Sequence, residues 1–182
     1  MKRNRFGTPN RAPLHMLSVI IPAQNEEGCI ASTVEHLHVE LRLHNIEHEI
    51  LVVDDGSSDN TWRVLTATSA RVPTLRALQN TGQHGFGRAV TYGFDHMSGD
   101  AAVIMMADES DDCRDVVRYW RQLNEGWECV FGSRFMAGGG YKNPKLDPKM
   151  VDKKLSDDEI DKLVAFLGAL ECSGKLESPP AL

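Results

Sequence analysis

The sequence has no closely spaced pair of cysteines. Its four cysteines, Cys29, Cys113, Cys129 and Cys172, lie far apart, and none belongs to a CxxC or CxxCH motif. This spacing excludes the usual cysteine-based zinc sites and covalent haem attachment, and it does not indicate a disulfide framework. We therefore expect reduced thiols, as in a cytoplasmic protein.

Long apolar stretches are missing as well. The longest run, residues 17–23 (LSVIIPA), is far shorter than the roughly 20 residues that cross a bilayer. The basic start MKRNRFGTPNR is not followed by the apolar segment of a signal peptide. We interpret residues 1–15 as a flexible basic tail. We expect a cytoplasmic protein, with peripheral attachment to a membrane surface left open.

An excess of basic residues is also absent. The chain has 26 acidic and 20 basic residues, a net charge of −6, whereas a nucleic-acid-binding protein needs a basic face to neutralise phosphates. No nucleic-acid partner is therefore expected. The length of 182 residues and the apolar content of 41% suit one globular domain with a core and a small appendage.

Strand-like and helix-like segments alternate from residue 17 to about residue 132. Short β-branched runs, apolar on both faces, are typical of buried parallel strands, and they occupy residues 17–21, 49–53, 74–78, 101–106 and 127–131. Helical spacing of apolar residues predicts helices at residues 30–41, 62–65 and 116–123, with Asp59 as the N-cap of the second. This order predicts an α/β fold with a parallel sheet and helices on both faces.

Polar side chains follow four of the five predicted strands. They are Gln24, Asn25 and Glu26 after the first, Asp54 and Asp55 after the second, Asp108 and Glu109 after the fourth, and Ser133 and Arg134 after the fifth. Because the carboxyl ends of parallel strands meet at one edge of a sheet, this edge is the expected ligand site.

Five segments together resemble one enzyme family. SVIIPAQNEE, VVDDGSSDNT, QNTGQHGFGRAVTYGF, GDAAVIMMADES and VFGSRF are similar, in order and spacing, to motifs of family 2 glycosyltransferases, which have the Rossmann-like GT-A nucleotide-sugar-binding fold. Within the family the likeness is strongest to polyprenyl- and dolichyl-phosphate sugar transferases, such as dolichyl-phosphate mannose synthases. It covers about residues 16–136, the donor-binding part of such an enzyme, so the chain resembles a truncated transferase.

The resemblance implies a nucleoside pocket at the first two strand ends. Pro22, Gln24, Asn25 and Glu26 would border it, and Asp54 or Asp55 would accept hydrogen bonds from the base or the ribose of a GDP- or UDP-linked sugar. A structural alternative is that the two aspartates only form a turn and cap the next helix.

The glycine-rich loop NTGQHGFGRA lies near the donor in the family. Arg88 of this loop would then meet a diphosphate oxygen, and the alternative is a solvated arginine on a flexible turn. The order of the glycines is not that of a dinucleotide-binding fingerprint, which disfavours a nicotinamide-dependent oxidoreductase.

The resemblance also implies a divalent metal, Mg²⁺ or Mn²⁺, at the end of the fourth strand. The family's Asp-x-Asp motif reads Met106-Ala107-Asp108 here, and a thioether is a poor ligand for these hard ions. We expect Asp108 to bind the metal, with Glu109 as a second ligand. Asp111 and Asp112 are nearby, and they also suit the start of the next helix, where carboxylates are favoured.

Arg134 in GSRF corresponds to an arginine that lies near phosphate groups in the polyprenyl-phosphate enzymes. Asp108 and Arg134 are therefore the expected catalytic residues. A polyprenyl phosphate acceptor is already anionic near neutral pH, so the reaction needs positioning and charge neutralisation rather than a strong base.

The segment after residue 136 has a different character. Residues 137–154 are rich in glycine and proline and predict a linker, and residues 155–182 predict an amphipathic helix with an irregular tail. Residues 138–182 resemble the C-terminal end of a cytochrome c domain of the di-haem peroxidase type, with Met150 at the place of an axial ligand. Because CxxCH is absent, no haem is expected.

The acceptor part of a family enzyme is not recognised in this sequence, so enzymatic activity stays open. The first hypothesis is a transferase that uses a nucleotide sugar. The alternative is a catalytically inactive nucleotide-sugar-binding remnant or fusion product, and an electron-transfer protein is a remote third.

Overall fold

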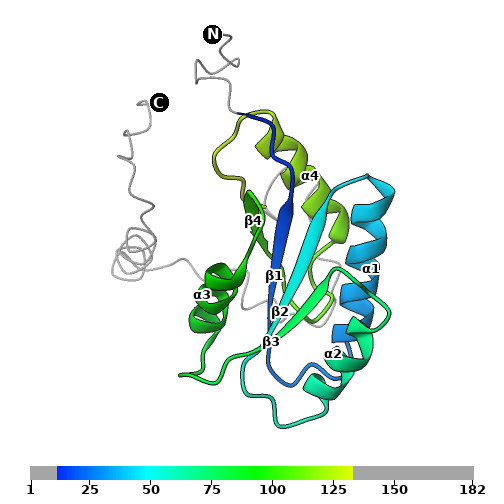
Figure 1. Ribbon diagram of the computed structural model, residues 1–182, viewed down its shortest axis with the longest axis vertical. Helices are drawn as coiled ribbons and strands as arrows, with labels where there is room; N and C mark the ends of the chain where they lie inside the picture. Colours follow the sequence, from blue (N-terminus) through cyan, green and yellow to red (C-terminus); the bar gives the residue numbers. More distant parts are fainter. Residues whose placement is uncertain (1–11, 133–182) are drawn as a thin grey trace, which may run out of the picture. The chain divides into compact units, whose positions relative to one another are not determined.

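The computed structural model describes residues 12–132, which form one parallel sheet of four strands and four helices (Figure 1). The strands lie in the order β3-β2-β1-β4. The elements in chain order are β1 (Leu17–Ala23), α1 (Ile30–Leu43), β2 (His48–Asp54), α2 (Thr61–Ser69), β3 (Leu75–Gln79), α3 (Phe86–His96), β4 (Ala101–Ile104) and α4 (Cys113–Asn124). The predicted α/β fold is confirmed.

The two central strands are the most apolar parts of the chain. Every residue of β1 and of β2 is buried, because strands at the centre of a parallel sheet are covered by helices on both faces. The register pairs Ala23 with Asp54 and Asp54 with Gln79. The ends of β1, β2 and β3 therefore lie side by side.

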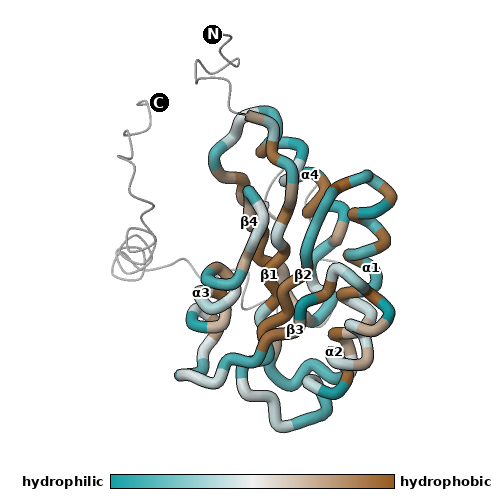
Figure 2. Tube along the Cα trace, in the orientation of Figure 1, coloured by the Kyte–Doolittle hydropathy of each residue, from teal (hydrophilic) through white to brown (hydrophobic). Residues whose placement is uncertain are grey.

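The helices form two layers. α1, α2 and α4 cover one face of the sheet, and α3 covers the other (Figure 1). Figure 2 shows the apolar residues concentrated along the strands between these layers. Ile21 belongs to the core on the α1 side, whereas Ile20 faces α3, where Gly93 allows the helix backbone to approach closely.

The predicted strand at residues 127–131 is wrong. Residues 127–131 form neither helix nor strand, and the Phe131 side chain is 80% exposed. An apolar run becomes a strand only where a neighbour accepts its hydrogen bonds, but the Trp127 N–H donates back to Gln122 O of α4 at 3.3 Å. Within residues 12–132, β4 pairs with β1 alone, and Ile104 is 45% exposed.

Two helix starts show how local capping works here. α2 begins at Thr61, one residue before the predicted start, and its N-cap is Asn60 instead of the predicted Asp59. Asp59 Oδ1 still accepts the Thr61 N–H at 2.9 Å. Asp112 is the N-cap of α4 and accepts the Arg114 N–H at 3.0 Å. This contact confirms the expectation that Asp112 suits the start of the helix.

Several predictions lie outside the described residues. They concern most of the basic tail, Arg134, the linker, the C-terminal helix and Met150. Within residues 12–132, Cys29, Cys113 and Cys129 form no disulfide. In the same range, the structure contains no helix with the length and apolar character that crossing a membrane requires.

Candidate functional site

The candidate site lies along the edge of the sheet where the strands end, which we call the carboxyl rim. It consists of four loops, residues 24–29, 55–60, 80–85 and 105–112, which follow β1, β2, β3 and β4. This edge is at the bottom of the view in Figure 1. All the predicted donor-site residues in the described range except Arg88, which is in the first turn of α3, lie in these loops or in the last residues of the strands before them.

Pro22 lies near the end of β1 and is buried there. A proline cannot donate to a sheet ladder. Because Ile20 O accepts the Met105 N–H, alternate residues of β1 face β4, and Pro22 is one of them. β4 ends at Ile104, opposite Ile20, so the missing N–H of Pro22 costs the sheet no hydrogen bond.

The loops after β1 and β2 are bound to each other through Asn25. Its Oδ1 accepts from the Ser58 N–H at 2.8 Å, the Ser58 hydroxyl at 3.2 Å and the Asp59 N–H at 3.4 Å. Its own N–H donates to Ser57 Oγ at 2.9 Å. Asn25 has a positive φ of 59°, a conformation that asparagine tolerates better than most residues. Its side-chain oxygen is thus occupied by the neighbouring loop.

The residues on both sides of Asn25 add further contacts between these loops. Gln24 Nε2 donates to the Asp55 backbone oxygen at 3.2 Å, and the Glu26 N–H donates to Thr61 Oγ1 at 2.8 Å. Glu27 accepts both the backbone and the side-chain N–H groups of Asn60. The first two rim loops therefore form one connected unit.

Glu26 shows that the rim is acidic. Burial raises the pKa of this carboxyl above its ordinary value, and the negative charges of Asp108 and Asp59 raise it further. Each of these three residues comes from a different loop, so the fold brings carboxylates from β1, β2 and β4 within electrostatic range of one another.

Asp54 and Asp55 are both buried, and they differ in their contacts. Asp54 Oδ1 accepts the Ser57 N–H at 3.2 Å. Asp55 uses both of its oxygens: Oδ2 accepts the Gly85 N–H at 2.6 Å, and Oδ1 accepts from Asn80 Nδ2 at 2.6 Å. The turn reading of these aspartates is therefore confirmed in part, since both fix loop backbone.

The loop after β4 carries the expected metal-binding residues. Asp108 is exposed, and its Oδ1 accepts the Ser110 N–H at 3.1 Å. Glu109 has a positive φ of 61°, and its carboxylate lies 4.0 Å from His36 of α1. Asp111 accepts the Met106 N–H at 2.8 Å and so closes the loop on itself. Asp108 is the carboxylate of this loop whose charge reaches Glu26.

A profile of the family described as Glycosyl transferase family 2 matches residues 18–174. The chain belongs to glycosyl transferase family 2. The match extends beyond the expected limit near residue 136 and through most of the segment that resembled cytochrome c, so that second resemblance receives no support.

Two curated relatives illustrate which members of this family the chain resembles. The chain is 32% identical to a dolichol-phosphate mannosyltransferase of Pyrococcus furiosus over 137 residues, which are 75% of this chain and 38% of that protein. It is 30% identical to an undecaprenyl-phosphate 4-deoxy-4-formamido-L-arabinose transferase of Klebsiella pneumoniae over 122 residues, 65% of this chain and 36% of that protein. The chain thus spans less than two fifths of the length of these relatives.

The solved structures agree on the fold. The glucosyl-3-phosphoglycerate synthase of Mycobacterium tuberculosis, in complex with Mn²⁺ and UDP-glucose, superposes with a TM-score of 0.51 at 24% identity. The superposition covers 62% of this chain and 40% of that chain. The GT-A-like arrangement of the sheet is therefore shown for this family 2 member.

The rim of this family 2 member suits a divalent cation in its chemistry. Carboxylate oxygens are the ligands that Mg²⁺ and Mn²⁺ prefer, and a cation would relieve the repulsion that raises the pKa of Glu26 beside Asp108. Among residues 12–132, no three histidine, cysteine or acidic side chains are arranged as a ready ligand set. The carboxylates of the rim therefore suit such a cation in their chemistry, without forming a complete ligand set within the described residues.

A concave region elsewhere on the chain is separate from this rim. A hollow of about 450 Å³ lies between the end of α1 and the end of α4, lined in part by His44, Trp120 and Arg121. It contains none of the predicted donor-site residues. We place the functional site at the rim because the carboxylates and the strand ends meet there.

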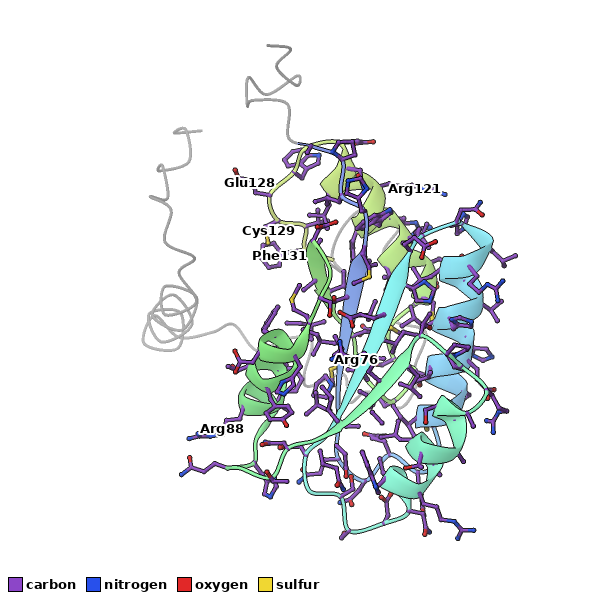
Figure 3. All side chains as sticks on the ribbon, viewed as in Figure 1. Arg76, Arg88, Arg121, Glu128, Cys129 and Phe131 are labelled. Atoms are coloured by element: carbon purple, nitrogen blue, oxygen red, sulfur yellow. The ribbon has the colours of Figure 1, made fainter. Side chains whose placement is uncertain are left out.

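Two residues shape the rim although no role was predicted for them. Asn80 directly follows β3 and begins the glycine-rich loop that the resemblance placed near the donor, so its position was the available signal. The role of Gly85 comes from its backbone N–H, which no residue type reveals. Arg88 was predicted, and its side chain extends outward from the first turn of α3 (Figure 3).

Proposed function

We propose that this chain is the donor-binding part of a polyprenyl-phosphate sugar transferase. It would bind a GDP- or UDP-linked sugar with Mg²⁺ or Mn²⁺ for transfer to a polyprenyl phosphate. The two relatives named above act, by their names, on dolichol phosphate and undecaprenyl phosphate, which supports this acceptor class. The observation that carries the proposal is the geometry of the rim, where Asn25 and Glu26 of the loop after β1 bind residues 58–61 after β2. The charges of Asp59 and Asp108 also act on Glu26 there.

The nucleoside would lie against the first two rim loops. Pro22, Gln24 and Glu26 border this part of the rim, and Asn25 keeps the loops together. Asp54 has one oxygen engaged with the Ser57 N–H, and a carboxylate can accept further donors from a base or a ribose. Asp54 is therefore our candidate for direct hydrogen bonding to the nucleoside.

Asp108 is our first candidate for a metal ligand, and Glu109 the second. A bound divalent ion would neutralise the negative charge that develops on the leaving diphosphate. Met106 supplies no ligand, so Asp108 carries more of this role than the corresponding residue of an Asp-x-Asp motif. To bind the metal, the Glu109 carboxylate would have to move away from His36, which lies 4.0 Å from it.

Arginines would position the anionic groups. Arg88 is exposed in the first turn of α3, where a guanidinium can contact a diphosphate oxygen, and Arg134 is the candidate beside the acceptor phosphate. Since that phosphate is already ionised near neutral pH, these residues orient and neutralise rather than remove a proton. A lipid-linked acceptor implies peripheral contact with a membrane.

One alternative is favoured by a specific observation. The first aspartate of the metal motif is replaced by Met106. A protein that binds the nucleotide sugar without transferring it would show this feature.

The experiment is a thermal-shift and calorimetric panel of GDP-mannose and UDP-glucose with and without Mn²⁺. We expect one donor to raise the melting temperature, with a larger shift when Mn²⁺ is present. No stabilisation by either class of donor would contradict the proposal. Incubation of the bound donor with polyprenyl phosphate vesicles then separates the two functions, because the remnant binds the donor but forms no glycolipid.

A further inference from the structure

Asp55 is the rim carboxylate that binds the loop between β3 and α3. Its side chain is 5% exposed. Oδ2 accepts the Gly85 N–H at 2.6 Å, and Oδ1 accepts from Asn80 Nδ2 at 2.6 Å and from the His84 ring nitrogen Nδ1 at 3.3 Å. All three donors come from the loop between β3 and α3, which is about 25–30 residues away in the sequence.

The loop is folded around this carboxylate. Asn80 Nδ2 also donates to Gln83 O at 3.0 Å, and Asn80 Oδ1 accepts the Gly82 N–H at 3.0 Å. Gly85 adopts a φ of 137°, which is available to glycine and not to residues with a side chain. Asp55 thus lies at the centre of a closed set of hydrogen bonds that defines the course of residues 80–85.

The surroundings of Asp55 stabilise the negative charge of its carboxylate. Burial alone would raise its pKa, but the donors from Gly85, Asn80 and His84 outweigh burial and hold the pKa below its ordinary value. Gly85 is also the N-cap of α3. The carboxylate therefore lies at the positive end of a helix, where a negative charge is favourable.

We infer that Asp55 is a positioning residue for the phosphates of the donor: it acts through residues 80–85 and the first turn of α3 instead of binding the base or the ribose. This inference rests on the function proposed above. Its oxygens already accept three donors of its own chain, and the turn that it anchors carries Arg88. The structure thus assigns the two neighbouring aspartates different tasks, with Asp54 left for the nucleoside.

The test is the variant Asp55→Asn, which keeps the shape of the side chain. Its amide NH₂ would face a donor, either the Gly85 N–H or Asn80 Nδ2, and the loop would lose at least one charge-assisted hydrogen bond. We expect amide hydrogen exchange of residues 82–88 to rise about tenfold or more. We also expect the affinity for the nucleoside diphosphate to fall about tenfold, while the affinity for the free nucleoside stays within about twofold.

A matched control is Glu49→Gln. Glu49 is also a buried carboxylate, and it accepts from Ser18 Oγ and the Ser98 N–H. It lies in β2, near the end of the strand that is far from Asp55. This variant should lose stability without changing exchange at residues 82–88 or either affinity. It therefore measures what the loss of a buried carboxylate does by itself.

Two results would overturn the inference. One is unchanged exchange of residues 82–88 in Asp55→Asn, and the other is an equal loss of affinity for the nucleoside and its diphosphate, as a direct ligand would give. If the wild-type protein binds no nucleotide, the proposed function fails and the inferred role on phosphates fails with it. The exchange measurement then still reports whether Asp55 holds the loop, so the two failures are distinguished.

Discussion

Asn25 Oδ1 lies 2.8 Å from the backbone nitrogen of Ser58, and this contact joins the ends of the two central strands. Asn25 follows β1, and Ser58 lies between β2 and α2. A ligand that touches both loops therefore meets a surface that is already assembled. Ligand binding therefore does not have to order these two loops, and it loses less conformational entropy than binding to separate loops would.

We predict that Asn25→Ala lowers the free energy of unfolding by about 1–3 kcal/mol, since it leaves loop N–H groups without their acceptor and forces alanine to a positive φ. Asn25→Gly removes the same hydrogen bonds but adopts that φ without strain. It should therefore be the more stable of the two by about 1 kcal/mol. Urea unfolding measures both, and equal stability of the two variants would show that the conformation of Asn25 carries no cost.

The packing of α3 on the sheet gives a second prediction. A Cβ at Gly93 would lie 2.5 Å from Ile20 Cγ2, so Gly93→Ala should destabilise the fold by about 1–3 kcal/mol through overpacking. Gly87 is in the same helix and has no atom within 4 Å of its Cβ position, so Gly87→Ala should be neutral or stabilising by about 0.5 kcal/mol. Thermal or urea unfolding compares them, and the same effect from both would contradict the packing.

Substitution of Met106 by a residue with a side-chain oxygen is predicted to strengthen metal binding. Met106→Asp restores the Asp-x-Asp pattern at an exposed position, and its carboxylate adds a hard oxygen ligand beside Asp108. We expect affinity for Mn²⁺ in the presence of nucleoside diphosphate to rise about tenfold. Met106→Asn supplies a neutral oxygen and should give a smaller gain. Calorimetric titration with Mn²⁺ would contradict this prediction if neither variant differs from the wild type.

A pair of histidines at the opposite end of the sheet predicts a pH effect on stability. His38 Nδ1 lies 3.1 Å from His48 Nε2 of β2 and 2.8 Å from Thr74 Oγ1. Burial lowers the pKa of His38 below its ordinary 6.5, and His48 and Arg42 lower it further. The unfolded chain therefore binds a proton at a pH where the folded chain does not.

Stability should consequently fall as the pH drops below about 6.5, until the lowered pKa of folded His38 is reached. His38→Gln should reduce this slope, which urea unfolding between pH 5 and pH 8 measures. His36→Gln, an exposed position on the same helix, tests the general effect of losing a histidine. An unchanged slope in His38→Gln would show that the pair does not contribute.

The sequence predicted the parts of the fold that depend on local pattern. The runs at β1 and β2 are β-branched and apolar on both faces, and such runs have few alternatives to a buried parallel strand. The same reasoning failed at residues 127–131, because the start of this run is bound to the end of α4 through the Trp127 N–H and Gln122 O. The apolar pattern of the run does not reveal such a contact.

The location of the candidate site was predictable from the sequence, but the hydrogen bonds within it were not. Polar residues after successive strands placed Asp54, Asp55 and Asp108 at one rim, as parallel topology requires. One partner of Asp55 is the backbone N–H of Gly85, 30 residues further along the chain. Asn25 reaches the Ser58 N–H from a backbone conformation with a positive φ. Both depend on tertiary structure, which residue types alone do not encode.

The most direct test of the proposed donor site is calorimetric titration of the wild type and Asp108→Asn with nucleoside diphosphate in the presence of Mn²⁺. Asp115→Asn is a matched control, because Asp115 is an α4 carboxylate that is paired with Arg118 and is not among the predicted donor-site residues. We predict metal-dependent binding by the wild type and the control, and a loss of at least about tenfold in Asp108→Asn. Equal Mn²⁺-dependent affinity in all three proteins would contradict the account.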